Sequence, residues 1–321
     1  MLMRNKNLII CLTPLQMLIM ETILRNEKNR GEDYTFICIC YNYNEKYNTY
    51  FNRLSDNVEA SFIYKVTSVS KVGRLFDLLS FNRNIIDKIM GNFNNIYFAS
   101  IDNPFVQLIL SRVKSNNFIS FDDGTANLWE NSVYNRPIER SNIQKVLSRL
   151  VGIKFNEELI KSKISKHYTI FYNNRYLKER SEFVSLFNLD IKKFSHEKKV
   201  KIFLGQPLSD YNFELFSKQN VEKIIKKLKI DSYFPHPREI EALPSLEIIR
   251  TNKIFEDYIV EVLGKGYSVE VYTFFSSAAL TVSGLENVQI FSVVNKQIFN
   301  YFSDLFNVFD ENGIRFIEVE F

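Results

Sequence analysis

Short apolar runs alternate along the chain with segments in which apolar residues recur at helical spacing. Residues 8–12 form an uninterrupted apolar run, and Leu15, Leu18, Ile19 and Ile23 then fall on one face of a helix. The same pattern predicts further strands at 34–41, 60–66, 95–99 and 117–121, a polar stretch after the first of these, and helices at 72–90, at 104–113 and from 125 onward. Strands that are apolar on both faces and lead into helices are typical of a parallel sheet covered on both sides.

The pattern changes at 141–197, which is helical and basic and contains one candidate strand at 168–172. From residue 200 the alternation resumes and predicts strands at 201–204, 232–234, 246–249, 269–274 and 288–293 and helices at 221–228, at 255–263 and from 276. We therefore predict an α/β protein with two doubly wound, Rossmann-like halves that face each other across a cleft. The expected divisions are an N-terminal domain at 1–155, an inter-domain helical region at 156–197 and a C-terminal domain at 198–321.

Ligands of doubly wound sheets bind beside the loops that follow the carboxyl ends of strands, so these loops are the places to seek chemistry. The first of them holds Thr13, Pro14 and Gln16. We expect Thr13 to cap the next helix, Pro14 to take its first position and Gln16 to close a capping box. The start of this helix is a secondary candidate site for an anion or a hydroxyl.

In a second loop, a buried strand runs directly into Asp122, Asp123 and Gly124. Because side chains alternate along a strand, the two carboxylates are expected on opposite sides, so at most one of them faces the cleft. The alternative is an ordinary Asp-Gly turn in which Asp123 caps the following helix.

A third loop, after the strand at 201–204, contains Gly205, Gln206 and Asp210. Gly205 permits a close approach of the backbone, and Asp210 is expected near the mouth of the cleft. The alternative for Asp210 is a solvated residue of a linker turn.

The fourth loop places His236 between Pro235 and Pro237, directly after a strand. The two prolines confine the backbone to extended geometry, so the imidazole is held in a fixed direction. No cysteine or second histidine is near, so His236 is a better proton donor or phosphate partner than metal ligand. The other histidines, His167 and His196, lie in the basic stretch without neighbours that indicate chemistry.

Two hydroxyls, those of Ser276 and Ser277, end a predicted strand and begin a helix. With the free N–H groups of the helix start they form a candidate anion cradle. The alternative is a serine that only caps the helix.

The composition narrows the function and the compartment. Lys and Arg total 41 against 37 Asp and Glu, so the net charge is only +4 and the charges are scattered. A nucleic-acid-binding protein needs a concentrated basic stripe, so we do not expect this function. The apolar stretch at 8–24 is interrupted by polar residues, so we expect neither a membrane span nor a signal peptide. Cys11, Cys38 and Cys40 all fall in predicted buried strands, so we expect free thiols and a cytoplasmic protein.

The order of Cys11 to Gln16, Asp122 to Gly124, His236-Pro237 and Ser276-Ser277 along the chain resembles the bacterial sialyltransferases. The spacing is most similar to glycosyltransferase family 52, which includes enzymes that sialylate lipooligosaccharides and capsular polysaccharides. This resemblance implies the GT-B fold and CMP-sialic acid as the donor co-substrate. It also implies an inverting transfer, α-2,3 in our prediction, to the hydroxyl of a galactose-terminated acceptor, without a metal or other cofactor.

The resemblance also implies roles for residues of the C-terminal half. His236, Ser276 and Ser277 correspond to the groups that contact the departing CMP phosphate. Phe255 and Glu256 correspond to a nucleotide-binding pair, in which the glutamate suits the ribose hydroxyls.

The catalytic base has two candidates. Some sialyltransferases use an aspartate of the Asp-Asp-Gly, here Asp123, and family 52 uses one upstream of the His-Pro, for which Asp210 is the preferred counterpart. Inverting transfer needs such a carboxylate on one side of the sugar and an acid, here His236, on the other. We assign the nucleotide side to Gly205, Gln206 and Pro237 as well, and an acceptor-side or structural role to Thr13, Gln16, Asp122 and Gly124.

Other functions stay open at this stage. The chain is alternatively a GT-B transferase of the same family with another nucleotide-sugar donor, or a non-catalytic subunit of glycan assembly. The basic segments at 141–154 and 221–229 fit either an anionic membrane surface or solvated protein surface. The inter-domain helices are also candidates for a homodimer interface, a part of the chain through which family members are known to pair.

Overall fold

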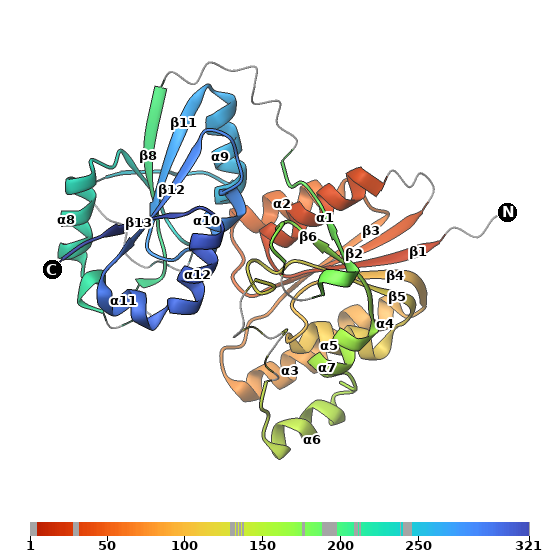
Figure 1. Ribbon diagram of the computed structural model, residues 1–321. Helices are drawn as coiled ribbons and strands as arrows, with labels where there is room; N and C mark the ends of the chain where they lie inside the picture. Colours follow the sequence, from red (N-terminus) through yellow and green to blue (C-terminus); the bar gives the residue numbers. More distant parts are fainter. Residues whose placement is uncertain are drawn as a thin grey trace. The chain divides into compact units, whose positions relative to one another are not determined.

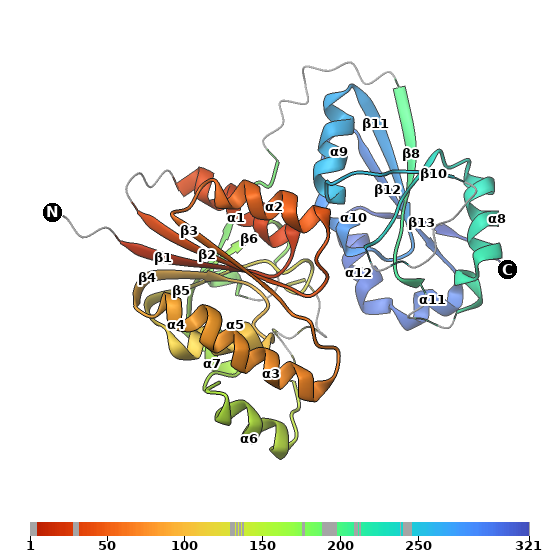
Figure 2. The same cartoon turned by 180° about the vertical axis from the view of Figure 1, so that it is seen from behind.

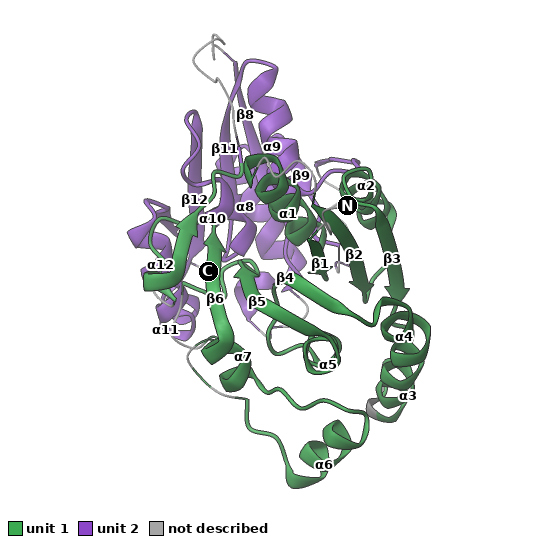
Figure 3. Cartoon of the chain, turned by 90° about the vertical axis from the view of Figure 1, so that its right-hand side faces the viewer, with its two compact units in different colours: residues 1–186 green, residues 187–321 purple. Residues whose placement is uncertain are grey.

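The computed structural model describes residues 5–27, 32–128, 132, 134, 136, 138–174, 177–187, 198–208, 211, 213–237, 239 and 246–320. The chain forms two compact α/β units, Met1–Leu186 and Phe187–Phe321 (Figure 3). Each unit is described by itself below.

Unit 1 is built on a parallel sheet, seven-stranded in its described part, with the order β3-β2-β1-β4-β5-β6-β7. The strands are β1 (Lys6–Cys11), β2 (Asp33–Cys40), β3 (Ala60–Lys65), β4 (Asn92–Phe98), β5 (Lys114–Phe121), β6 (Ile164–Thr169) and β7 (Ser181–Phe183). The helical segments are α1 (Pro14–Glu27), α2 (Glu45–Ser55), α3 (Lys71–Phe81), the π-helix η1 (Asn82–Ile86), α4 (Asp87–Ile89), α5 (Pro104–Arg112), α6 (Asn142–Leu150), α7 (Glu157–Lys163) and the 3₁₀ turn η2 (Lys178–Arg180). Helices α1 and α2 cover one face of the sheet, and α3, α4, α5 and α7 lie on the other (Figures 1 and 2).

The middle strands of unit 1 are buried on both faces, which is why they read as continuous apolar runs. Leu8, Ile9 and Ile10 of β1 are fully buried. Each such side chain contributes about 1.5–3 kcal/mol relative to an exposed one. The cysteines Cys11, Cys38 and Cys40 are free and buried, as predicted, and burial is the main cause that raises the pKa of each thiol.

Unit 2 is built on a second parallel sheet, six-stranded in its described part, with the order β10-β9-β8-β11-β12-β13. The strands are β8 (Lys198–Leu204), β9 (Ser232–Phe234), β10 (Glu247–Ile248), β11 (Tyr267–Thr273), β12 (Val288–Val294) and β13 (Arg315–Glu318). The helical segments are the 3₁₀ turn η5 (Glu214–Phe216), α8 (Lys218–Leu228), α9 (Phe255–Gly264), α10 (Ser277–Val282), α11 (Lys296–Tyr301) and α12 (Ser303–Glu311). Phenylalanine rings fill much of the core, with Phe274 packed between Phe203 and Phe216 at ring-centroid distances of 5.6 and 4.9 Å.

Both sheets reverse their order of growth once, between β1 and β4 in unit 1 and between β8 and β11 in unit 2. Ligands of doubly wound sheets bind at this switch point, beside the carboxyl ends of the two strands. The loops after β1 and β4 and after β8 and β11 are therefore the candidate ligand-binding loops of the two units.

The prediction of two doubly wound parallel sheets is confirmed, but several elements differ from it. The expected polar stretch after β2 contains α2, which the pattern missed because only Tyr50 and Leu54 of this helix are buried. The helix expected from 125 is wrong, since residues 124–128 form turns. The interval expected to be an inter-domain helical region instead adds α7, β6 and β7 to unit 1, while residues 188–197 lie outside the described part. The elements from α11 to β13 were not predicted.

Candidate active site

At the carboxyl edge of the first sheet, Gln16 joins the ends of three strands. Its Nε2 atom donates hydrogen bonds to Ser100 Oγ after β4 (2.9 Å) and to Asp123 Oδ1 after β5 (2.7 Å). Its Oε1 atom accepts from the backbone N–H of Leu12 after β1 (2.6 Å). Ser100 Oγ also donates to Asp123 Oδ2 (2.6 Å), so both carboxylate oxygens of Asp123 accept hydrogen bonds. This network spans the switch point of unit 1.

The start of α1 follows the prediction in part. The helix begins at Pro14, and Thr13 Oγ1 accepts from the backbone N–H of Gln16 (3.2 Å), as expected of a cap. The reciprocal half of the capping box is absent, because the Gln16 side chain bonds to Leu12, Ser100 and Asp123 instead of the Thr13 N–H. Gln16 is fully buried, so these partners satisfy a side chain that water does not reach.

Asp122 points away from Asp123 into the protein, as the alternation predicts. It is fully buried, and its carboxylate accepts hydrogen bonds from Thr169 Oγ1 and the Ile170 N–H, both at 2.8 Å. Its Oδ1 atom lies 3.0 Å from Nε2 of His167. Asp122 is therefore a structural residue that ties β5 to β6.

We expected His167 to have no neighbours that indicate chemistry, and this prediction is wrong. The imidazole is fully buried, and its Nδ1 atom lies 2.7 Å from Ser120 Oγ, opposite the contact with Asp122. Asp122 and His167 are 45 positions apart along the chain, and no local pattern of the sequence links them. Their one sequence signal is that Asp122 directly follows one predicted strand and His167 directly precedes another, where buried polar groups need partners.

The turn after Asp123 requires Gly124, whose φ of 56° lies in the left-handed region. The alternative in which Asp123 caps a following helix is wrong, because its side chain bonds to Gln16 and Ser100 and no helix begins there. Asp102 lies in the same neighbourhood, and its pKa is raised by burial and by the charge of Asp123. Unit 1 therefore presents an acidic edge.

In unit 2, the side chain of Gln206, two residues after β8, lies at the switch point. Its Oε1 atom accepts hydrogen bonds from Thr273 Oγ1 (3.1 Å) and from the backbone N–H groups of Phe274 (3.1 Å) and Phe275 (2.8 Å). The side chain is buried, so it joins the loop after β8 to the loop after β11. The structure thus gives Gln206 an internal role at the place where we expected a nucleotide contact.

Glu239 holds the loop of His236 in place, and sequence reasoning missed it. Its Oε2 atom accepts from the backbone N–H of His236 (2.6 Å), and its Oε1 atom accepts from the N–H of Gln206 (3.2 Å) and from the Tyr233 hydroxyl. In return, the Glu239 N–H donates to the His236 carbonyl (3.0 Å). Burial raises the pKa of the Glu239 carboxyl, while the bonds from Tyr233, His236 and Gln206 oppose that rise. The sequence did contain a signal for this role, because Glu239 stands three residues after His236 at the end of a predicted strand.

Gly205, for which we predicted a close approach of the backbone to a ligand, is crowded by side chains of its own unit. A Cβ atom at this position would lie 2.4 Å from Glu239 Oε2 and 2.5 Å from the Tyr233 hydroxyl oxygen. A side chain at this position would therefore force the Tyr233–Glu239 pair to shift.

The remaining candidates of unit 2 fall into two groups. His236 is half-buried and Pro237 is exposed, both directly after β9, whereas Asp210 lies outside the described residues. Phe255 begins α9 and packs edge-on against Phe234 at 5.2 Å between ring centroids.

Glu256, Ser276 and Ser277 gather around α9 and α10, which contact one another. Glu256 is buried and accepts from Thr281 Oγ1 (3.0 Å), so this carboxylate is tied to α10. Ser276 is half-buried just before α10, and Ser277 is exposed as its first residue. Within the described ranges, no three His, Cys, Asp or Glu side chains are grouped closely enough to hold a metal ion.

Comparison with known families gives the identity of the chain. The model of glycosyltransferase family 52 matches residues 31–297, which is most of the sequence. The chain belongs to glycosyltransferase family 52. The resemblance read from the motifs is thereby confirmed.

Two relatives of this family 52 chain are named sialyltransferases. It is 29% identical over 317 residues to a CMP-N-acetylneuraminate:beta-galactoside alpha-2,3-sialyltransferase of Pasteurella multocida, covering 98% of this chain and 99% of that one. It is 30% identical over 290 residues to an N-acetyllactosaminide alpha-2,3-sialyltransferase of Haemophilus influenzae, covering 88% and 90%. Both alignments extend over both units.

A solved structure supports the fold. Glycyrrhiza uralensis UGT73P12, complexed with glycyrrhetinic acid 3-O-monoglucuronide, superposes with a TM-score of 0.51 at 9% identity, covering 99% of this chain and 82% of that one. The family 52 chain has the GT-B fold, with two Rossmann-like α/β domains. At this level of identity, the likeness concerns the fold alone.

Proposed function

We propose that this family 52 enzyme transfers sialic acid from CMP-sialic acid to a terminal galactose hydroxyl of a bacterial surface glycan, a lipooligosaccharide or a capsular polysaccharide. The single observation that carries the proposal is the alignment with the Pasteurella multocida enzyme, which spans 98% of this chain and whose name states that donor, a β-galactoside acceptor and the α-2,3 linkage. The transfer proceeds with inversion and forms an α-2,3 linkage.

His236 is the proposed acid, and the geometry of its loop supports this role. Its backbone is fixed by Pro235 and Pro237 and by two hydrogen bonds with Glu239, so the Cα–Cβ bond that carries the imidazole keeps its direction. A phosphate placed beside it favours the imidazolium, the form that donates a proton to the departing CMP. The hydroxyls of Ser276 and Ser277 are proposed to bind the same phosphate.

Asp210 is the preferred base, with Asp123 as the alternative. The base takes the proton from the acceptor hydroxyl as that oxygen attacks the anomeric carbon and the bond to CMP breaks. Both oxygens of Asp123 already accept hydrogen bonds from Gln16 and Ser100. An Asp123 that served as the base would have to offer one of these oxygens to the acceptor as well, which favours Asp210.

Neither a metal nor another cofactor enters the proposal. The developing charge on the CMP phosphate is instead neutralised by the His236 imidazolium and by hydrogen bonds from the serine hydroxyls. Glu256 is proposed to bind the ribose, and it would then share its carboxylate between the ribose and Thr281.

We place the enzyme in the cytoplasm, at the inner face of the membrane, where a lipid-linked acceptor is within reach. No helix in the described ranges has the length and apolar character needed to cross a membrane. A homodimer remains a prediction of the sequence alone.

The linkage analysis of the product tests this proposal. CMP-sialic acid and lactose are incubated with the enzyme and EDTA, and the product is examined by NMR and by cleavage with a linkage-specific sialidase. The expected product is α-2,3-sialyllactose. A trisaccharide with another sugar, formed only from a different nucleotide-sugar, would overturn the donor and leave the family membership intact.

A further inference from the structure

The buried imidazole of His167 contacts three positions of the segment at the end of β5. His167 lies opposite Ser120 in the β5–β6 ladder, and its Nδ1 atom is 2.7 Å from the Ser120 hydroxyl oxygen. Its Nε2 atom lies 3.0 Å from Asp122 Oδ1 and 2.8 Å from the side-chain amide of Asn127. All four side chains are fully buried. One ring therefore holds both ends of the turn at residues 122–127.

The 122–127 turn determines where the carboxylate of Asp123 lies. Because side chains alternate and that of Asp122 points into the protein, that of Asp123 points out at the carboxyl edge of the sheet, where it is half-buried. Gly124 takes a φ of 56°, and the Ala126 N–H donates to the Asp123 carbonyl (3.3 Å). The direction of Asp123 thus depends on the two turn ends that His167 holds.

The Asp123 carboxylate is also held from the strands on its other side. Within the described part of the chain, Oδ1 accepts from Gln16 (2.7 Å) and Oδ2 accepts from Ser100 (2.6 Å). An ionised carboxylate offers about four lone-pair sites, so each oxygen has the capacity to accept one more hydrogen bond. Asp123 is therefore a fixed, half-buried carboxylate with acceptor capacity to spare at the switch point of unit 1.

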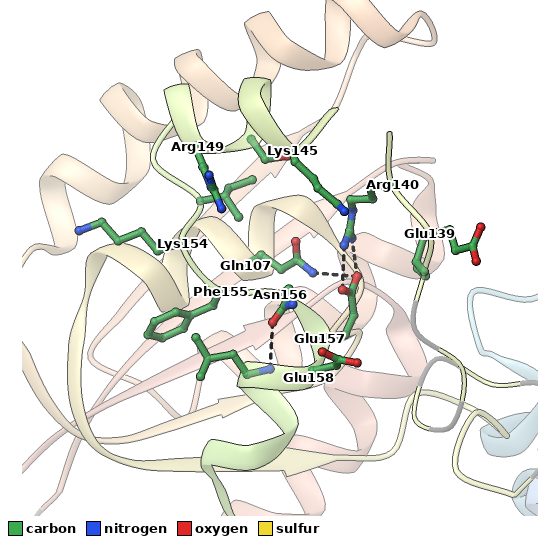
Figure 4. A pocket seen from close by; sticks show the side chains of 14 residues that line it. Gln107, Glu139, Arg140, Lys145, Arg149, Lys154, Phe155, Asn156, Glu157 and Glu158 are labelled. Carbon is green, nitrogen blue, oxygen red and sulfur yellow. Dashed lines mark hydrogen bonds and ion pairs between the residues drawn. The ribbon is translucent and has the colours of Figure 1, made fainter. Parts of the chain in front are cut away.

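The partner Ser100 is itself held in an uncommon conformation. Its φ of 51° lies in the left-handed region, which few non-glycine residues adopt. The carbonyl of the next residue, Ile101, accepts from Gln107 Nε2 (2.9 Å), which also donates to Glu157 Oε1 (3.1 Å). Glu157 in turn forms an ion pair with Arg140 (Figure 4). The loop after β4 is thus fixed from behind, which keeps the Ser100 hydroxyl on Asp123.

We propose that His167 is a positioning residue for the acceptor: by holding both ends of the 122–127 turn, it aims Asp123 at a hydroxyl of the acceptor sugar. Sugar hydroxyls are donors, and a carboxylate accepts their hydrogen bonds strongly because it is charged. The hydroxyl bound by Asp123 is a different one from the hydroxyl that Asp210 deprotonates. This inference rests on the proposed function, in which the residues that bind CMP belong to unit 2 and unit 1 is left to hold the acceptor.

Two amides at position 167 separate positioning from packing. An asparagine amide reaches about as far as Nδ1 of histidine, and a glutamine amide about as far as Nε2. His167→Asn therefore keeps the contact with Ser120 and releases the turn, whereas His167→Gln keeps the turn and releases Ser120. Both substitutions place an amide in the same buried space, so each is the control for the other.

The acceptor is the quantity to follow, by steady-state kinetics with lactose and by an NMR titration of lactose in the presence of CMP. We expect His167→Asn to raise the KM and the Kd for lactose about tenfold, and His167→Gln to keep both within about threefold of wild type, because only the first loses the bond to a charged group at the turn. The KM for CMP-sialic acid should stay near that of wild type in both variants.

A second pair of variants keeps the inference testable if His167→Asn does not fold. Asn127→Ala and Ser120→Ala each remove one buried contact with the same imidazole, at the far end of the turn and outside it respectively. Asn127→Ala should raise the KM for lactose about fivefold, and Ser120→Ala should leave it near wild type, since a lost buried partner acts on the group it held. Urea denaturation checks that both variants fold.

Three results would overturn the inference. Folded His167→Asn and Asn127→Ala enzymes with the wild-type KM for lactose would make the imidazole purely structural. An equal rise in both members of each pair would assign the effect to a general loosening of unit 1. These two results leave the proposed function intact, whereas a wild type that neither binds nor sialylates lactose would overturn both the inference and the proposed acceptor.

Discussion

The Glu239 carboxylate lies 2.6 Å from the backbone nitrogen of His236 and accepts its hydrogen bond. The same carboxylate accepts from the N–H of Gln206 at 3.2 Å. One side chain therefore fixes the loop after β9 against the loop after β8. Gln206 in turn holds the loop after β11, so the three loops at the edge of the second sheet form a single hydrogen-bonded unit.

The first prediction concerns Glu239 as a positioning residue. Glu239→Gln replaces a carboxylate that accepts from three donors with an amide that has only one acceptor oxygen, so a buried donor loses its partner. We expect kcat to fall about tenfold or more with a smaller change in KM, because His236 loses its fixed direction. Steady-state kinetics measures the split, and Glu286→Gln, an exposed glutamate of unit 2, is the control.

A stability titration checks the state of this carboxyl. Burial raises its pKa above the ordinary 4.5, so the folded protein binds its proton more tightly than the unfolded chain does. That contribution is complete below the ordinary pKa and is lost as the pH rises through the folded value. The difference in unfolding free energy between wild type and Glu239→Gln should therefore favour wild type more at pH 4 than at pH 7. A difference that does not change with pH would contradict the raised pKa.

The second prediction compares two glycines. Gly205→Ala places a methyl group within 2.5 Å of both Glu239 and Tyr233, whereas Gly284→Ala meets no atom within 4 Å. Because overpacking costs about 1–3 kcal/mol, Gly205→Ala should lower the unfolding free energy by that amount and reduce turnover. Gly284→Ala should leave both near wild type, and urea denaturation measures the two. If Gly205→Ala changed the unfolding free energy as little as Gly284→Ala does, the side chains around Gly205 would relieve the clash without cost.

The third prediction assigns the acid. His236→Ala should lower turnover by at least an order of magnitude while the fold stays intact, since a general acid contributes about a hundred- to ten-thousand-fold in rate. Turnover of CMP-sialic acid with lactose, together with circular dichroism, is the measurement. Turnover at the wild-type rate would remove His236 from the mechanism.

The fourth prediction separates the two candidate bases. Asp210→Asn should abolish most of the turnover, whereas Asp123→Asn should act mainly through the network of Gln16 and Ser100 and cost less. Both variants are first tested for folding by thermal denaturation. If Asp123→Asn is the more damaged of two folded variants, the preference for Asp210 is wrong.

The sheets and the strand ends could be predicted from the sequence, whereas the partners of the polar side chains there could not. Apolar runs such as that of β1 are local signals, and a polar residue after such a run marks a strand end directly. The contacts of Asp122 with His167 and of Gln16 with Asp123 join residues 45 and 107 positions apart, which only the folded sheet brings together.

Two further features escaped prediction for different reasons. Helix α2 has few buried residues, so its apolar periodicity is weak. No role was predicted for Glu239, because nothing local shows that the space left by Gly205 receives its carboxylate.

The release of CMP from CMP-sialic acid tests the central claim most directly. It is measured with EDTA present, with and without a galactose-terminated acceptor such as lactose. The account predicts rapid release that depends on the acceptor. No release in the presence of acceptor, with CMP binding confirmed by calorimetry, would contradict the assignment of a sialyltransferase to this chain, and an absence of CMP binding would contradict the donor itself.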